Sequence, residues 1–263
     1  MIIAQISDMH IQQDRRPLKG RFDAAGNLET CIQQLNALKP DLVLATGDLV
    51  NSGVAAEYAF LRELLAPLQA PLYLMPGNHD DRALMREFFP GHDYLFTDHA
   101  RLNHVIECGG LRIIMLDSHI PGKDEGAIGA AQLDWLESRL AGAPHIPAII
   151  ALHHPPFPTS PRYVGNFFCA DGPELQQAVS RHPNVLRVIS GHLHRNIQVN
   201  FAHAIGSVCP STAVTFGLAI APKTPFFYSS EPPGYHLHLW QPDKPIITHT
   251  VLLPPAMPAA ADD

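Results

Sequence analysis

The chain has 263 residues, of which 46% are hydrophobic and 16% are charged, a composition that indicates a folded globular protein. Its formal net charge is −7 and Lys and Arg form no run, which argues against a nucleic-acid partner. The four cysteines show no disulfide spacing, no charged leader precedes the first apolar run, and no apolar run approaches the roughly 20 residues of a membrane-spanning helix, so we expect a cytoplasmic protein with no membrane partner.

The first third of the chain alternates short apolar runs with amphipathic stretches. Strands are expected at Met1–Ser7, Asp41–Thr46 and Pro71–Met75, and helices from Asn27 to Leu38 and from Ala55 to Leu68. We expect Asn27 to cap the first helix, because Asn side chains accept hydrogen bonds from free backbone amides at helix starts. This βαβαβ order predicts parallel strands with helices outside the sheet.

The remainder of the chain continues with mixed elements. The expected elements are a helix at Asp81–Phe89, a hairpin of Arg101–Ile106 and Leu111–Leu116, a helix at Ala131–Leu140, a strand at Ala148–Leu152, a helix from Pro173, and strands at Val185–Ile189, Ala204–Cys209, Tyr235–Trp240 and Ile246–Leu253. The loop Pro155–Gly172 is rich in proline and aromatic residues, and we expect it to wall a substrate pocket. Alternation in Tyr235–Trp240 predicts that His236 and His238 face solvent and bind no metal.

Five of the apolar runs end in Asp, Asn or His. The motifs are Asp8-Met9-His10, Gly47-Asp48, Gly77-Asn78-His79-Asp80, His153-His154 and Gly191-His192-Leu193-His194. In open α/β sheets, ligands bind in the crevice beyond the carboxyl ends of the strands. Each motif alone could be an ordinary turn. Five together indicate one site that gathers polar side chains.

Seven residues of these motifs carry atoms that bind metals: Asp8, His10, Asp48, Asn78, His154, His192 and His194. Imidazole and carboxylate donors suit Fe, Mn, Zn or Co, and the lack of thiolates argues against a structural zinc site. Seven donors are too many for one ion and suit two ions that share a carboxylate. Such a pair lowers the pKa of a shared water and holds both oxygens of an in-line displacement. The set therefore predicts phosphoester hydrolysis with two metal ions.

The five motifs, in their order and spacing from residue 8 to residue 194, resemble those of the calcineurin-like metallophosphoesterases. The subgroup that the chain resembles most contains the bacterial class III cyclic-nucleotide and glycerophosphodiester phosphodiesterases, with Ile6–His10, His153–Pro156 and Pro210–Thr212 carrying the likeness. Met9 departs from the Thr that is common in this subgroup, at a position that is not a ligand.

The resemblance implies an α/β fold, a four-layer αββα sandwich of two mixed sheets flanked by helices. It implies a single domain over residues 1–253, with C-terminal strands and a cap region at 197–253. The Pro- and Ala-rich tail at 254–263 is expected to be frayed.

The resemblance also implies a role for each motif residue. The first metal would be bound by Asp8, His10 and His194, and the second by Asn78, His154 and His192, with Asp48 bridging the two. His79 would lie beside the scissile phosphate, so that the expected catalytic residues are His79, Asp48 and Asn78. Asp80 is expected to orient the turn. His153 is expected outside the ligand set, because adjacent strand residues point to opposite faces.

The function that these features predict is hydrolysis of a small phosphodiester, such as cAMP or a glycerophosphodiester. A phosphomonoesterase or protein phosphatase is one alternative, although the arginine that such relatives place shortly after the Asp48 motif is absent from Leu49–Gly53. A nuclease is another, weakened by the acidic net charge, and a metal-free scaffold is a third, weakened by the intact set of seven donors. A small-molecule diester is the expected partner, and a homo-oligomer is common among relatives.

Overall fold

The computed structural model describes residues 1–98, 100–159, 168–218, 220 and 224–254. Its helices are α1 (Ala24–Leu38), α2 (Ala55–Leu65), α3 (Arg82–Phe88), α4 (Ala130–Ala141) and α5 (Gly172–Arg181), with short 3-10 turns η1 (Gln13–Arg15) and η2 (Asp93–Phe96). Its strands are β1 (Ile2–Ile6), β2 (Leu42–Thr46), β3 (Leu72–Met75), β4 (His104–Cys108), β5 (Leu111–Leu116), β6 (Ala148–Leu152), β7 (Val185–Ser190), β8 (Ile197–Phe201), β9 (Ala204–Val208), β10 (Gly234–Leu239) and β11 (Ile247–Leu252).

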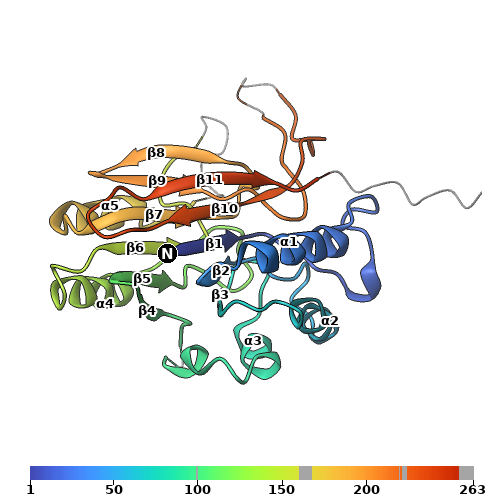
Figure 1. Ribbon diagram of the computed structural model, residues 1–263, viewed down its shortest axis with the longest axis horizontal. Coiled ribbons are helices and arrows are strands. Elements are labelled where there is room, and N and C mark those ends of the chain that lie inside the picture. The colour runs from blue at the N-terminus through green and yellow to red at the C-terminus, as the bar shows by residue number, and fades with distance from the viewer. Residues whose placement is uncertain (99, 160–167, 219, 221–223, 255–263) are drawn as a thin grey trace, which may run out of the picture.

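The strands form two mixed sheets (Figure 1). The first has the order β11-β10-β1-β2-β3, in which β1, β2 and β3 are parallel and β10 and β11 are antiparallel additions. The second has the order β4-β5-β6-β7-β9-β8, with a parallel centre and antiparallel strands at both edges. The expected pair of mixed sheets is therefore confirmed, and the βαβαβ pattern at the N-terminus describes part of the first sheet.

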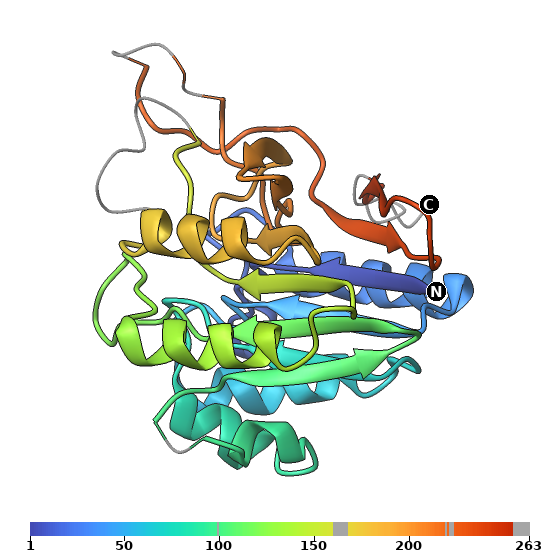
Figure 2. The same ribbon diagram turned by 90° about the vertical axis from the view of Figure 1, so that its left-hand side faces the viewer.

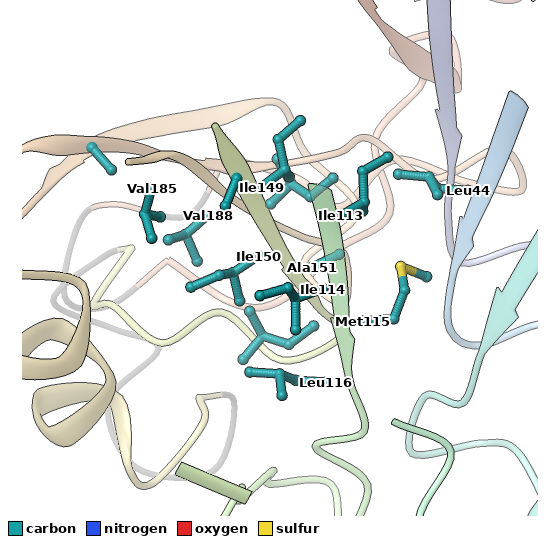
Figure 3. Close-up of a cluster of buried hydrophobic side chains, with 14 of the residues drawn as sticks. Leu44, Ile113, Ile114, Met115, Leu116, Ile149, Ile150, Ala151, Val185 and Val188 are labelled. Atoms are coloured by element: carbon teal, nitrogen blue, oxygen red, sulfur yellow. The ribbon is translucent and has the colours of Figure 1, made fainter. Parts of the chain in front are cut away.

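Two apolar cores produce four layers (Figure 2). One core joins the first sheet to α1 and α2, and the other fills the space between the sheets and extends to α4 and α5. Strand β1 contributes to both, because Ala4 packs on the helix side and Ile3 packs between the sheets. Figure 3 shows part of the second core, where Leu44 of the first sheet lies with Ile113 and Met115 of the second.

The first helix begins earlier than the sequence pattern predicts. Helix α1 starts at Ala24, because the carboxylate of Asp23 accepts a hydrogen bond from the amide of Gly26 at 2.9 Å and so caps the first turn. Asn27 is not the cap but a residue of the first turn, and its side-chain amide donates to the carbonyl of Ala213 at 3.1 Å. The prediction of Asn27 as the cap is therefore wrong, since an aspartate four residues earlier satisfies the free amides.

The two histidines of β10 are buried, so the prediction that they face solvent is wrong. His236 and His238 are both 0% exposed. Alternation along β10 is present, since Tyr235 and Leu237 pack in the core under α1 and α2. The other face of β10 is covered as well, because the second sheet lies over it. A polar face can thus be an interior face when two sheets pack together.

Within the described residues, no helix has both the length and the apolar character needed to cross a membrane.

Candidate metal centre

The polar motifs follow the carboxyl ends of β1, β2, β3, β6 and β7, and the backbone there is unusual. Five non-glycine motif residues have a positive φ angle, namely Asp8, His10, Asp48, His192 and His194. Such angles cost energy for side chains with a Cβ and concentrate at functional sites. Backbone hydrogen bonds from the amide of Asp8 to Gly47 and from the amide of His10 to Asp48, both 3.0 Å, hold the first two motifs side by side.

Asp8, His10 and His194 form one buried group of donors. The Nδ1 atom of His194 donates to the carbonyl of Val214 at 2.8 Å, so its Nε2 atom carries the lone pair. This Nε2 atom lies 3.0 Å from Nε2 of His10 and 3.4 Å from a carboxylate oxygen of Asp8. Burial lowers the pKa of His10 to about 3, so its imidazole is neutral. Two imidazoles and a carboxylate converging on one point are a donor set that fits a metal cation.

Asp48 lies between this group and a second one. Its carboxylate is 3.5 Å from Nε2 of His10 and 3.4 Å from Nε2 of His153. Burial alone would raise the pKa of Asp48, but the neighbouring histidines, His153 foremost, lower it well below its ordinary value. Gly77 makes the position of this carboxylate possible, because a Cβ at residue 77 would overlap Oδ1 of Asp48.

The imidazole of His153 faces the second group, contrary to the expectation that it points away. Its Nδ1 atom donates to the carbonyl of Thr46 at 2.7 Å, and its Nε2 atom lies 3.2 Å from Oδ1 of Asn78. The expectation rested on strand alternation, but β6 ends at Leu152 and both histidines lie beyond the strand. Burial would lower the pKa of His153, yet the carboxylates of Asp48 and Asp8 raise it to about 9. The carboxylates that favour a proton on this imidazole would also favour a metal cation at the same place.

His154 belongs to the same neighbourhood. Its Nδ1 atom lies 2.8 Å from the hydroxyl of Ser118, and its buried Nε2 atom has no hydrogen-bond partner among the described residues. Ligand atoms of His153, His154 and His192 lie within 4.8 Å of one another. Burial and the neighbouring His192 hold the pKa of His154 well below its ordinary value. The role of His154 as a ligand stays a prediction, with His153 as a second candidate for the same position.

The second sheet is tied to the first at this site through Asp8. The backbone amide of His192 lies 3.0 Å and 2.9 Å from the two carboxylate oxygens of Asp8. The amide of Gly191 donates to the carbonyl of His153 at 3.0 Å, which places the ends of β6 and β7 together. The structure thus brings all seven expected donors, from five separate strand ends, to one edge of the sandwich.

His79 lies beside these donors, and one ligand atom each of His79, His10 and Asp48 lie within 4.8 Å of one another. Its Nδ1 atom donates to the carbonyl of Asn51 at 2.5 Å, and its ring packs edge-on against His10 with centroids 4.7 Å apart. Burial would lower the pKa of His79, but Asp48 and the bond to Asn51 raise it overall. A histidine held in this way can carry a proton next to the metal groups.

Asp80 holds the turn, as expected. Its carboxylate accepts hydrogen bonds from the amide of Gly77 at 2.8 Å, the amide of Leu49 at 3.1 Å and the hydroxyl of Tyr58 at 2.9 Å. Burial, with the charge of Asp48, raises the pKa of Asp80 to about 7. The residue therefore fixes the two loops that carry Asp48 and Asn78 relative to each other.

Two residues that support the site, Asp117 and Ser118, were not among the expected site residues. Ser118 contacts Nδ1 of His154, as described above. Its neighbour Asp117 is fully buried and pairs with Arg82 through two bonds of 2.5 Å and 2.8 Å. The polar pair at the end of β5 is visible in the sequence, but it contains no imidazole and so does not stand out as a metal motif.

A cavity of about 160 Å³ opens over the donor groups. Its lining residues are His10, Leu18, Lys19, Asp48, Asn51, Asn78, His79, Asp124, His192, His194, Val214, Phe216 and Tyr228. Phe216 stacks on the imidazole of His194 with centroids 3.9 Å apart and planes 12° apart. The rings of Phe226 and Tyr228 pack against Phe216, with centroids 5.0 Å and 5.9 Å from its centroid.

The expectation that Pro155–Gly172 walls the pocket is tested only in part. Residues 160–167 of the stretch Pro155–Gly172 lie outside the described residues. Within the described part of that stretch, Phe157 is buried in the core against Phe201 and does not line the cavity. Among the described residues, Phe216 and Tyr228, from the segment between β9 and β10, supply the aromatic surface.

A family model for the calcineurin-like phosphoesterases matches residues 1–196 of the chain, which include all five motifs. The chain belongs to the calcineurin-like phosphoesterase family.

Several phosphodiesterases are similar to this protein over most of its length. It is 32% identical over 242 residues to the glycerophosphodiester phosphodiesterase GpdQ of Enterobacter lignolyticus, covering 90% of this chain and 86% of that relative. It is 37% identical over 226 residues to a cAMP/cGMP dual specificity phosphodiesterase of Mycobacterium tuberculosis, covering 84% and 70%. It is 30% identical over 223 residues to the 3',5'-cyclic adenosine monophosphate phosphodiesterase CpdA of Escherichia coli, covering 81% and 77%.

Solved structures confirm the fold. A dimetal phosphatase from Danio rerio superposes with a TM-score of 0.69 at 13% identity, covering 95% of this chain and 98% of that one. GAP50, the anchor in the inner membrane complex of Plasmodium, superposes with a TM-score of 0.63 at 15% identity, covering 96% and 84%. A phosphatase and a membrane-complex anchor share this fold, so the fold by itself does not decide the function.

Proposed function

We propose that this protein is a metal-dependent phosphodiesterase that hydrolyses a small phosphodiester at the cavity over the strand ends. The observation that carries the proposal is the pair of buried donor groups on the cavity floor, with Asp48 in contact distance of both. The phosphodiesterase relatives, at 30% identity or more over most of the chain, support the same reaction class. Residues 1–253 would act as one domain, because β10 and β11 complete the sheet that carries Asp8 and Asp48.

Two ions would be held by the chain's own donors. Asp8, His10 and His194 would bind the first, and Asn78 and His192 would bind the second together with one or both of His153 and His154. Asp48 would bridge them. When bound, such ions acidify a water molecule and neutralise charge on the phosphate group. Fe, Mn, Zn and Co all accept these ligands, so the donor set does not select among them.

Residues next to the proposed ions would hold the bridging carboxylate in place and contact the phosphate of the substrate. Asp48 is kept ionised by its histidine neighbours, and the amide of His79 donates to its Oδ1 atom at 2.9 Å. His79 itself, fixed by the carbonyl of Asn51, lies in the cavity wall where it can contact a phosphate oxygen or donate a proton to the leaving alkoxide. The side-chain amide of Asn78 would lie close to the same phosphate oxygen.

The cavity wall favours a diester with a small organic arm. Leu18, Val214, Phe216 and Tyr228 provide an apolar surface for the arm. One face of Phe216 is covered by His194, so that face cannot stack on a nucleobase. The cavity volume of about 160 Å³ is similar to that of an engineered protein cavity of about 150 Å³ that binds benzene. A volume of this size suits a glycerol-sized or aryl-sized group. Glycerophosphodiesters are therefore favoured over cyclic nucleotides.

Monoester hydrolysis is the second candidate, and Lys19 is the observation that favours it. Lys19 lines the cavity and could pair with the extra negative charge of a monoester. Its side chain is exposed, however, and exposed ion pairs contribute about 1 kcal/mol or less. We expect Lys19→Met to change kcat/KM for a diester by less than about fivefold.

The proposal is tested with enzyme reconstituted with Mn²⁺ and assayed at one pH. Initial rates on bis(p-nitrophenyl) phosphate and p-nitrophenyl phosphate are compared first, and then rates on a glycerophosphodiester and on 3',5'-cAMP. A higher kcat/KM on the diester is expected, with the glycerophosphodiester ahead of cAMP. A higher kcat/KM on the monoester would overturn the diesterase assignment.

The number of ions is checked separately by elemental analysis. We expect two ions per chain in fully active enzyme and no turnover after chelation. One ion or fewer in fully active enzyme would contradict the proposed pair. A homo-oligomeric state and a cytoplasmic location stay predictions, and light scattering of the purified protein tests the first.

A further inference from the structure

A row of polar side chains lies buried between the two sheets, behind the metal site and outside the cavity. Gln5 of β1, Thr46 of β2 and His238 of β10 are each 0% exposed. None of them is among the donor groups or the cavity lining. Buried polar groups without partners are costly, so each of these side chains needs a hydrogen-bond partner inside the sandwich.

The hydrogen bonds of Gln5 fix its orientation. Its side-chain amide nitrogen donates to the carbonyl of Ser190 at 3.1 Å and to the hydroxyl of Thr46 at 3.0 Å. Its side-chain oxygen can only accept, so Nε2 of His238, 3.1 Å away, must donate to it. The other nitrogen of His238 then accepts from the hydroxyl of Thr248, 2.8 Å away.

This arrangement requires a neutral His238 with its proton on Nε2. Burial lowers the pKa of His238 to about 3, which agrees with the neutral form. The charged and titratable groups facing it are His236 and Arg187, and both also favour the neutral ring. The row therefore has one consistent set of donors and acceptors from Thr248 to Thr46.

The partners of Gln5 stand directly before two metal motifs. Thr46 is the last residue of β2 and precedes Gly47-Asp48, while Ser190 is the last residue of β7 and precedes Gly191-His192. The carbonyl of Thr46 also accepts the bond from Nδ1 of His153, so Thr46 touches the row with its side chain and the metal site with its backbone. Gln5 thus links the first sheet to the second sheet. Its two partners, Thr46 and Ser190, each lie two residues before a metal donor, Asp48 and His192.

We infer that Gln5 is a positioning residue for the metal pair: through Thr46 and Ser190 it sets the separation between the strand ends that carry Asp48 and His192. The inference rests on the proposed function, because it assigns the residue to the same site. No bond is made or broken by Gln5. Its effect is to hold donors from two sheets at a separation that both ions can share, as outer hydrogen bonds do for metal ligands generally.

The main test is Gln5→Met, which keeps the length and volume of the side chain and removes its hydrogen bonds. The matched control is Tyr235→Phe, which removes the bond of 3.1 Å between the buried Tyr235 hydroxyl and Gln34 on the opposite face of β10. Metal-free forms of both are titrated with Co²⁺ while the visible spectrum is recorded. The spectrum reports the ligand geometry and needs no substrate.

We expect Gln5→Met to bind Co²⁺ about 10–100-fold more weakly at one of the two sites, with an altered spectrum. Its kcat should fall while KM for bis(p-nitrophenyl) phosphate stays near the wild-type value. Tyr235→Phe should lose stability and keep both the affinity and the spectrum. Folded Gln5→Met with wild-type affinity and spectrum would overturn the inference.

A second variant decides the matter if Gln5→Met does not fold. Thr46→Val keeps the shape of the residue and its carbonyl, and removes only the hydroxyl that Gln5 contacts. A weaker Co²⁺ affinity supports the inference, and an unchanged affinity overturns it. Wild-type protein that binds no Co²⁺ would refute the proposed function instead, so the two failures are distinguishable.

Discussion

The backbone amide of His79 donates a hydrogen bond to Oδ1 of Asp48 across 2.9 Å. This bond joins the motif that follows β2 to the motif that follows β3, and it uses one lone pair of the carboxylate that lies between the two donor groups. The position of Asp48 is therefore set by the neighbouring loop as well as by its own strand. Because the donor is a backbone amide, a side-chain substitution at His79 keeps this bond, whereas a substitution at Asp48 removes it.

Asp48→Ala is expected to reduce activity more than any other single change among the donors. A bridging carboxylate holds both ions, whereas water can replace one terminal ligand in part. The measurement is kcat and metal content for Asp48→Ala and His10→Ala, prepared in parallel. If Asp48→Ala retained more activity than His10→Ala, Asp48 would not be the bridge.

His79→Ala is expected to keep both ions and lose about 10²–10⁴-fold in kcat, the usual contribution of a general acid or a positioning group. The loss should be largest for substrates with poor leaving groups, because these need a proton most. Elemental analysis of the variant accompanies the kinetics. Loss of an ion would show that the imidazole, whose Nδ1 atom now donates to Asn51, is a ligand after all.

His153→Ala is expected to lower metal content more than His154→Ala does. Nδ1 is engaged in both imidazoles, with Thr46 in His153 and with Ser118 in His154, so Nε2 is the atom left for an ion. The Nε2 atom of His153 lies 3.4 Å from Asp48 and 3.2 Å from Asn78, two of the expected ligands. The two variants remove the same type of side chain from adjacent residues, so each is a control for the other. Full metal content in His153→Ala, or a greater loss in His154→Ala, would show that His154 is the main ligand.

Tyr58→Phe is expected to destabilise the protein by about 1–3 kcal/mol. The change leaves the buried carboxylate of Asp80 and the amide of Asp81 without the hydroxyl that each contacts, at 2.9 Å and 2.8 Å. Urea unfolding of the wild type and the variant measures the difference. A difference below about 0.5 kcal/mol would show that water replaces the hydroxyl.

His236→Leu is expected to stabilise the metal-free protein by about 1 kcal/mol near pH 7. Both ring nitrogens of His236 are buried and have no hydrogen-bond partner among the described residues, so an apolar side chain of similar size removes a desolvation cost. Burial, with the charge of Arg187, lowers the pKa of His236 from 6.5 to about 4.

The same variant should change the pH dependence of stability. Between pH 6.5 and about 4 the unfolded chain protonates residue 236 and the native protein does not, so stability falls as the pH falls in that window. Each such histidine contributes a slope of about 1.4 kcal/mol per pH unit. Unfolding curves of the two proteins at several pH values should differ by this slope. Parallel curves would mean that His236 is protonated in the native state.

The sequence by itself determined the chemistry of this protein. Five apolar runs that end in Asp, Asn or His define strands and the polar groups at their ends, since both are local patterns of residues next to one another. From them followed the donor types, the expectation of two ions and the family. The carboxyl ends of parallel strands meet at one edge, so residues 8 and 194 could be assigned to one site without coordinates.

Only the tertiary structure decided how these parts face one another. The burial of His236 and His238 depends on a second sheet covering β10, and no local pattern encodes that cover. The direction of the His153 ring depends on the carbonyl of Thr46, 107 residues away in the chain. The aromatic wall of Phe216 and Tyr228 likewise arises where the C-terminal segment returns to the first motif. Such contacts join distant residues, and their geometry is set by the packing of two sheets rather than by the preference of any single residue.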